Sequence, residues 1–181
     1  MTFRPFNLQN PVSRLDETTT GILPSGLGAR FVMEGGAAEG RFSLVEHPIG
    51  PRGLAAPMHL HTREDEYSFV LEGEWGFKLA DEVVYARPGD LVYKPRNVWH
   101  TFWNNSDQPA RLLVIISPSG FEHFFARLAD VVAAAAPDTM EQLIRLSEEY
   151  GLLMDVDSVP GLVEAYGLAM PEMGAPVAPS A

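Results

Sequence analysis

The length, composition and charge of the chain limit both its architecture and its partners. Its 181 residues suit one domain with a sizeable core and leave little room for a second. The formal net charge of -11 repels phosphate backbones and anionic lipid, so neither nucleic acid nor a membrane surface is an expected partner. The absence of cysteine excludes disulfides, thiolate metal ligands and cysteine nucleophiles.

The apolar segments of the chain are short. No apolar run approaches the roughly 20 residues that span a bilayer. The opening MTFRPFNLQNPVSRLD contains no continuous apolar stretch of the kind found in signal peptides. We therefore expect a soluble, cytoplasmic protein.

The first part of the chain divides into an arm and a run of strands. Residues 1 to 28 mix Pro, Asn, Thr and Gly without a clear period, so we expect an N-terminal arm with at most one short strand. In residues 29 to 118, short apolar runs rich in β-branched and aromatic residues alternate with turn residues, which indicates a single antiparallel β-barrel or sandwich. The predicted strands are ARFVM, RFSLVEH, EYSFVLEG, EWGFKLA, DLVYKP, VWHTFW and RLLVIIS.

Helical signals follow the last of these strands. Residues 119 to 168 are expected to form helices that pack on the outside of the barrel, because a β-layer must cover its apolar face. Two capping boxes, Ser119-x-x-Glu122 and Asp138-x-x-Glu141, predict the starts of two helices.

The end of the chain carries weaker signals. Gly151 is expected to end the second helix in a left-handed conformation, and a third short helix is expected from about Val159 to Tyr166. Residues 169 to 181 are rich in Pro and Ala and are expected to form a disordered tail.

Three of the five histidines lie at positions from which their side chains can converge. Residues two apart in a strand share a face, so His59 and His61 point the same way. Glu66 opens the next strand after a turn-like stretch, 62 to 65, and a hairpin there would bring it opposite the histidines. His100 lies in the strand VWHTFW. Three imidazoles and one carboxylate are suitable ligands for Fe, Mn, Ni, Cu or Zn, although a single inward histidine is more often a hydrogen-bonded core residue.

Turn residues around these side chains complete two longer patterns, Gly53-x5-His59-x-His61-x4-Glu66-x6-Gly73 and Gly89-x5-Pro95-x-Asn97-x2-His100-x3-Asn104. Together they resemble the two motifs of the cupin superfamily, with every metal-ligand position filled. One position departs from the family, because Asn97 stands where cupins have glycine. Asn tolerates the left-handed conformation well, so we expect the turn to be kept.

The resemblance implies an all-β fold, the cupin double-stranded β-helix or jelly-roll barrel, with a C-terminal α-helical extension. It also implies one divalent metal ion per chain, with iron favoured and Mn, Ni, Cu and Zn as alternatives. Its ligands would be His59, His61, Glu66 and His100. A cupin barrel without metal is the competing interpretation.

A broader stretch, from about Ala29 to Tyr150, resembles the single-domain cupins named for their similarity to quercetin 2,3-dioxygenase. This implies a metal-dependent dioxygenase acting with O2 on a small enolic, diketone or phenolic compound, with Glu66 as the catalytic base. Two alternatives stay open: a non-redox metal-dependent isomerase or lyase, and a non-catalytic cupin that binds a small ligand. A sugar-nucleotide isomerase would need cations for phosphates, and the nearest in sequence are Arg41, Arg52, Arg63, Lys94 and Arg96.

Other residues are weaker candidates. Phe102, Ser68 and Phe77 are expected to line a substrate pocket, although aromatic residues at strand spacing are more often core. His47 and His123 are not expected to bind metal. Strand edges and apolar tryptophans favour a homodimer.

Overall fold

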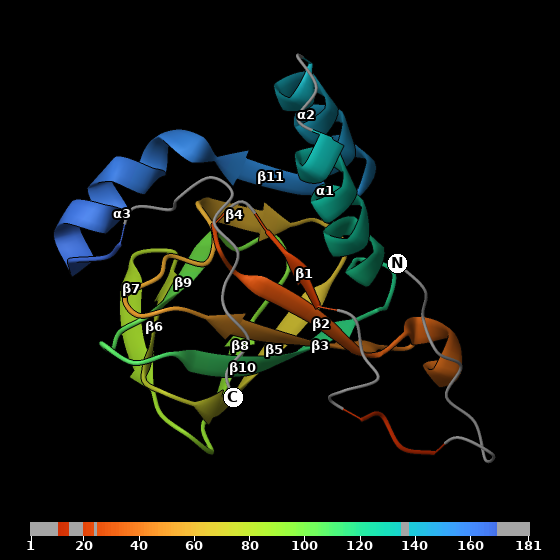
Figure 1. Cartoon of the computed structure of the whole chain (residues 1–181), viewed down its shortest axis with the longest axis horizontal. Coiled ribbons are helices and arrows are strands. Elements are labelled where there is room, and N and C mark those ends of the chain that lie inside the picture. Colours follow the sequence, from red (N-terminus) through yellow and green to blue (C-terminus); the bar gives the residue numbers. More distant parts are fainter. Residues whose placement is uncertain (1–10, 15–19, 24, 135–137, 170–181) are drawn as a thin grey trace.

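The computed structural model describes residues 11–14, 20–23, 25–134 and 138–169, which fold into two facing β-sheets with helices at one side (Figure 1). Most of the expected arm, at residues 1–10 and 15–19, lies outside the described residues. The same holds for the expected disordered tail beyond residue 169.

Both sheets are antiparallel throughout their paired strands. The six-stranded sheet has the order β1 (Thr20–Ile22), β2 (Gly28–Met33), β3 (Ser43–Ile49), β10 (Ala110–Ser117), β5 (Asp65–Glu72) and β8 (Leu91–Lys94). The five-stranded sheet has the order β11 (Leu152–Asp155), β4 (Met58–His61), β9 (His100–Asn104), β6 (Trp75–Leu79) and β7 (Glu82–Ala86).

The strand pairing is nested around the β6–β7 hairpin. Going outward from that hairpin, β5 pairs with β8, β4 with β9 and β3 with β10. A long antiparallel ribbon folded over in this way forms a jelly roll, which confirms the expected fold class.

The predicted hairpin between the histidine strand and the glutamate strand is wrong. β4 pairs with β9 and β11, whereas β5 pairs with β8 and β10, so the two strands belong to different sheets. The stretch between them crosses the gap between the sheets instead of folding β5 back along β4. Glu66 therefore faces the histidines from across the barrel.

The strands β7 and β11 were not predicted. β7 is an edge strand bonded to β6 alone, and most of its side chains are exposed. β11 follows the second helix and pairs along the whole of β4, with Leu152 opposite His61 and Met154 opposite His59. The C-terminal extension thus completes the sheet beside the histidine strand.

The helices are α1 (Glu122–Ala134), α2 (Thr139–Glu149) and α3 (Val159–Tyr166), with 3-10 turns at Gly35–Ala38 and Val156–Ser158. The third helix and the left-handed Gly151, with φ 66°, are as expected. No helix in the described residues combines the length and the apolar character that crossing a bilayer requires.

Neither predicted capping box forms. The side chain of Asp138 makes no cap hydrogen bond and accepts one from the Gln142 amide instead. The buried Glu122 carboxylate accepts hydrogen bonds from the backbone N–H groups of Gly120 and Gly35, so it ties the start of α1 to the loop after β2.

The main core fills the space between the sheets with inward side chains such as Val45, Val70, Phe77 and Ile116, each at most 1% exposed. Burying a side chain of this size stabilises the fold by about 2 kcal/mol. A second cluster packs α3 onto the outside of the five-stranded sheet, where the Tyr166 ring stacks on Trp103 at 4.2 Å between centroids.

Candidate metal centre

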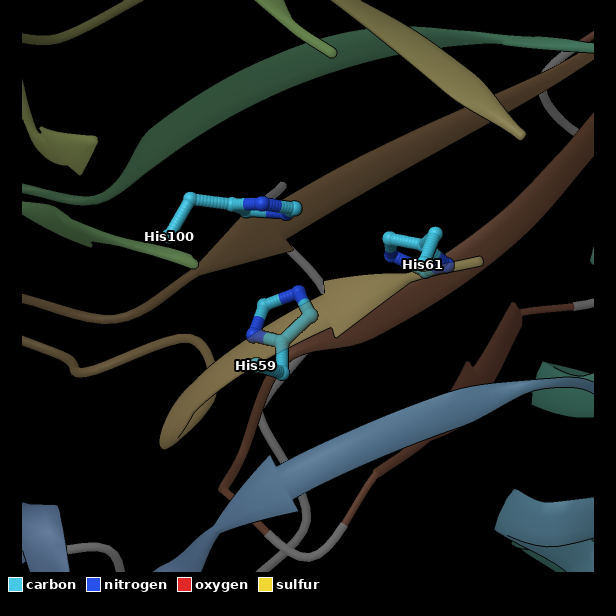
Figure 2. A group of neighbouring side chains, drawn as sticks. All are labelled: His59, His61 and His100. Carbon is cyan, nitrogen blue, oxygen red and sulfur yellow. The ribbon is translucent and has the colours of Figure 1, made fainter. Parts of the chain in front are cut away.

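Three histidines from β4 and β9 converge inside the barrel. His59 and His61 lie two apart on β4 and therefore share its inner face, and His100 opens β9 directly opposite His59. One nitrogen from each imidazole lies within 4.8 Å of the other two, and Figure 2 shows the three rings gathered over β4. All three residues are buried, with exposed fractions of 6%, 2% and 1%.

The turn before β9 holds these strands in register. Asn97, which takes the place of the motif glycine, adopts φ 62°, so the left-handed turn is kept as expected. Its backbone N–H donates to the carbonyl oxygen of His61 at 2.7 Å. The turn that leads to His100 is thereby bonded to the backbone of a second histidine.

Hydrogen bonds to the backbone set which ring nitrogen is free. Nδ1 of His59 lies 2.8 Å from the carbonyl oxygen of Pro57, and Nδ1 of His100 lies 2.9 Å from that of Val98. A carbonyl oxygen can only accept, so we assign the proton of each neutral ring to Nδ1 and the lone pair to Nε2. Backbone contacts of this kind orient histidines that bind metals.

Burial keeps two of these imidazoles neutral. Loss of solvent lowers the pKa of His61 to about 4, and it lowers the pKa of His59 well below the usual 6.5, with the neighbouring histidines adding to the effect at His59. Neutral imidazoles are the form that binds metal, so both rings are ready as ligands at neutral pH.

Glu66 approaches from β5 of the opposite sheet. Its Oε2 lies 3.7 Å from Nε2 of His61 and 3.6 Å from Nε2 of His100. Oε2 also lies 2.6 Å from Nζ of Lys94. Burial by itself opposes ionisation of Glu66, but the charge of Lys94, followed by His61 and His100, holds its pKa well below 4.5.

Lys94 is a member of this cluster that the sequence reasoning missed. It pairs with Glu66 across β5 and β8, is 1% exposed, and places Nζ 4.4 Å from the centre of the Phe102 ring. The strand LVYK held a usable signal, because Lys94 alternates with Val92 on the inward face. The sequence places it only among the cations available to a phosphate.

The four other cations considered for phosphate binding are engaged at the surface. Arg52 pairs with Asp107, Arg96 with Asp65 and Arg41 with Glu39, while Arg63 donates to the carbonyl oxygen of Glu149. Of the five, Lys94 is the one inside the barrel.

Several buried polar atoms in this region lack a hydrogen-bond partner. Nζ of Lys94 and Oε2 of Glu66 are close enough to form an ion pair, but the angles between them do not fit a hydrogen bond. Both atoms can therefore still form hydrogen bonds with another group. Other buried atoms without a partner are His61 Nδ1, His100 Nε2, Ser68 Oγ and Ser43 Oγ. Leaving such groups unpaired destabilises a fold, so their concentration here points to something that binds between them.

The three histidines fit a divalent metal ion, and Glu66 lies close to two of them. Two ligand atoms that each lie about 2.1 Å from one ion are at most about 4.2 Å apart, and the two distances from Glu66 Oε2 to imidazole nitrogens meet that limit. The histidine nitrogens, within 4.8 Å of one another, would draw slightly closer around an ion. Three imidazoles and a carboxylate suit Fe, Mn, Ni, Cu and Zn, as the sequence predicted.

The two remaining histidines are not part of this group. Buried His47 bonds through Nδ1 to the carbonyl oxygen of Gly28 at 2.8 Å and packs edge-on against Phe125 of α1. His123 is half-exposed, with Nε2 3.7 Å from Oε1 of Glu34. In the described residues, neither histidine belongs to the group of converging imidazoles.

The residues predicted to line a substrate pocket are all buried, with Ser68 and Phe77 at 0% and Phe102 at 5% exposure. The Phe102 ring lies next to Nζ of Lys94 and stacks on Phe77 at 6.1 Å between centroids. Their contact with a substrate stays a prediction.

Comparison with known proteins gives one family and a set of relatives. Residues 46–116 match the model of the cupin domain. A stretch of 92 residues is 28% identical to a quercetin 2,3-dioxygenase from Bacillus subtilis (strain 168), covering 51% of this chain and 27% of the relative. The chain therefore spans about a quarter of that relative's length.

Three solved structures illustrate the shared fold. The chain is similar to a sugar phosphate isomerase of the cupin superfamily from Silicibacter pomeroyi, with 23% identity and a TM-score of 0.53, over 59% of this chain and 75% of that one. It is similar to KdgF from Halomonas sp., with 18% identity and a TM-score of 0.55, over 62% and 98%. A predicted oxalate decarboxylase from Thermotoga maritima gives 19% identity and a TM-score of 0.55, over 59% and 98%. At these identities the likeness shows the fold alone.

Proposed function

The chain belongs to the cupin superfamily, and from that premise we propose that it is a metal-dependent enzyme of the dioxygenase type. Its substrate is a small enolic, diketone or phenolic compound, and O2 is the second reactant. The observation that carries the proposal is the set of three buried imidazoles, two with Nδ1 bonded to the backbone, facing an ionised carboxylate. The sequence similarity to a quercetin 2,3-dioxygenase supports the oxidative part.

The ligands in this proposal are Nε2 of His59, His61 and His100 together with Glu66, and the ion is one divalent metal per chain, with iron favoured. When bound, a metal of this kind supplies Lewis acidity toward an oxygen chelate and, if redox-active, electron exchange with O2. Imidazoles bind a metal in their neutral form, so among the proposed ligands Glu66 alone offsets part of the charge that the ion offers to an anionic substrate.

Glu66 is the proposed base. A substrate that binds through an enol or phenol oxygen must lose its hydroxyl proton. A bound metal would lower the pKa of that hydroxyl, and Oε2 of Glu66, ionised beside Lys94, could then accept the proton. The position is suitable because Oε2 lies between two imidazole nitrogens and the lysine ammonium. Glu66 and Lys94 are 3% and 1% exposed, so bulk water does not reach them.

Oxygen consumption tests the reaction. Protein loaded separately with Fe, Mn, Ni and Cu is expected to take up O2 in the presence of at least one small enolic, diketone or phenolic compound. Glu66→Gln should lower turnover more than substrate binding if Glu66 is the base. No uptake with every metal and every compound would contradict the dioxygenase proposal.

A non-redox reaction is the second candidate, and Lys94 is the observation in its favour. A buried ammonium beside the ligand set can hold a substrate anion in an isomerase or lyase that needs no electron transfer. Metal analysis of protein purified without added metal separates the two: iron, copper, manganese or nickel favours redox chemistry, and zinc favours the Lewis-acid reaction.

We also propose that the chain forms a homodimer through the outer face of the six-stranded sheet. The cross-strand pairs Phe69–Leu91 and Tyr67–Tyr93 lie on this face, and Phe69, Leu91 and Tyr93 are 37%, 56% and 49% exposed. Sedimentation of wild type and Tyr93→Lys tests this, with a dimer expected for the first and a larger monomer fraction for the second. A wild type that stays monomeric at micromolar concentration would refute it.

A further inference from the structure

The unexpected member of the site is Lys94. The chain has only two lysines, Lys78 and Lys94, and one of them lies at the centre of the barrel, 1% exposed, against the Glu66 carboxylate. A buried ammonium is costly unless an anion balances it. A role for Lys94 therefore has to explain which anion does so in the working protein.

The charges of the cluster balance without an ion and do not balance with one. Imidazoles bind a metal in their neutral form, and the charges of Glu66 and Lys94 cancel each other. A divalent cation brings two further positive charges, and Glu66 is then shared between that cation and Lys94. A buried site with a surplus of two positive charges favours an occupant with two negative charges.

We propose that Lys94 determines substrate specificity by binding an ionised carboxylate of the substrate. The substrate class is then a small enolic compound that carries a carboxylate next to its chelating oxygens. This inference rests on the proposed function, because the chelating oxygens are those that the metal site receives. Lys94 is the cation of this cluster in the described residues, and the buried Ser68 hydroxyl, on the next inward position of β5 after Glu66, is a donor without a partner.

A carboxylate fits this position better than a phosphate. A phosphate has three oxygens that each need donors, and Lys provides a single point charge. The guanidinium groups of Arg52, Arg63 and Arg96, which could supply more, are bonded at the surface. The Phe102 ring lies 4.4 Å from Nζ of Lys94, and Nζ has no hydrogen-bond partner, so it can still donate to an anion.

The effect of Lys94 on metal binding gives a first readout that is independent of activity. In Lys94→Met the competing positive charge is removed, and the affinity for Ni²⁺, measured by calorimetry, is expected to rise at least about tenfold. Lys78→Met is the matched control, because Lys78 is partly exposed on β6, and its affinity should equal that of wild type. An unchanged or lower affinity in Lys94→Met would overturn the charge argument.

The binding of two matched probes to the Ni²⁺-loaded protein gives the second readout. Acetopyruvate and acetylacetone share the same chelating enol and differ in that a carboxylate of the first replaces a methyl group of the second. Wild type and Lys78→Met should bind acetopyruvate at least about tenfold more tightly than acetylacetone, and Lys94→Met should lose that preference. No preference in wild type, or one that survives in Lys94→Met, would overturn the inference.

A third probe, inorganic phosphate, and a first measurement of Ni²⁺ binding separate a failure of this inference from a failure of the proposed function. Inorganic phosphate is tested as a competitor of acetopyruvate. If phosphate binds as tightly as acetopyruvate, and this binding depends on Lys94, the carboxylate assignment is wrong. If wild type binds no Ni²⁺, the proposed function fails and the inference fails with it; if it binds Ni²⁺ but shows no carboxylate preference, only the inference fails. The comparison of acetopyruvate with acetylacetone on wild type needs no variant. It therefore tests the carboxylate preference even if Lys94→Met does not fold.

Discussion

Two buried glutamates, Glu46 on β3 and Glu66 on β5, are each 3% exposed and each contact positive side chains, yet their surroundings differ. Glu46 accepts hydrogen bonds from Arg30 on β2 and from Arg111 on β10, with Arg111 Nε 2.8 Å from Oε1. Both of its oxygens are therefore satisfied. Glu66 has one close cation, Lys94, and its Oε2 forms no aligned hydrogen bond while two imidazole nitrogens lie nearby.

The difference separates a structural ion cluster from a site that awaits a partner. Burial raises the pKa of Glu46, but the hydrogen bonds from Arg111 and Arg30 outweigh it and leave the pKa below 4.5. The Glu46 cluster joins three strands of one sheet and is complete without any ligand. The Glu66 cluster joins both sheets and is complete only when something binds between its members.

The largest expected effect is on metal affinity. His100→Gln removes one imidazole, and we expect Ni²⁺ affinity to fall by more than about 100-fold, since even residues that only support ligands are worth about 10–100-fold. His47→Gln is the matched control, because His47 is equally buried but bonded to Gly28. Calorimetric titration of both variants measures the difference. Equal losses of Ni²⁺ affinity in the two variants would show that His100 and His47 do not differ in their role in metal binding.

The next effect is on stability. Glu46→Gln removes the buried carboxylate that pairs with both Arg30 and Arg111. We expect the free energy of unfolding to fall by about 3 kcal/mol, near the lower end for a broken buried pair, because the half-exposed Arg111 can be hydrated. Urea unfolding followed by circular dichroism gives the value. A loss below about 1 kcal/mol would show that this cluster contributes little.

The Glu66 cluster should respond differently to removal of its charges. In the metal-free protein, the double variant Glu66→Gln/Lys94→Met removes an incompletely bonded ion pair, so the free energy of unfolding should be unchanged or higher by about 1–2 kcal/mol. The same urea experiment, run in chelator, measures it. A loss as large as that of Glu46→Gln would mean that both clusters are structural.

The smallest effect is a pH dependence. Because the folded-state pKa of Glu46 is lowered, its contribution to stability is fully present above the unfolded value of 4.5 and is lost as pH falls through the folded value. The difference in unfolding free energy between wild type and Glu46→Gln should therefore be constant from pH 7 to pH 5 and shrink below pH 4.5. If the difference in unfolding free energy grew as the pH fell, the pKa of Glu46 would be raised on folding and not lowered.

Local patterns in the sequence were enough to predict much of the site. Alternation along β4 and the spacing around Asn97 placed His59, His61 and His100 on inward positions, and the structure brings these three together. The strand runs predicted an antiparallel barrel or sandwich for the same reason, since each inward face is marked by apolar residues two apart; the jelly roll itself was implied by the resemblance to cupins.

What was missed depends on contacts between distant parts of the chain. Glu66 lies in the other sheet from His61 because its strand, β5, pairs with β10. The residue opposite Glu66 there, Ile116, is fifty residues further along the chain. β11 is a short strand with three exposed residues, and it forms because β4 offers an unpaired edge. Lys94 breaks the rule that charges face solvent, so a pattern based on polarity alone does not place it inside.

The central claim is that His59, His61, His100 and Glu66 hold one metal ion between the two sheets. An anomalous difference map from a crystal soaked in Ni²⁺ tests this directly. The account predicts one strong peak per chain within bonding distance, about 2.1 Å, of the three Nε2 atoms, with Glu66 drawn toward it from Lys94. A map with no peak among these side chains, or with its peak on surface carboxylates, would contradict it.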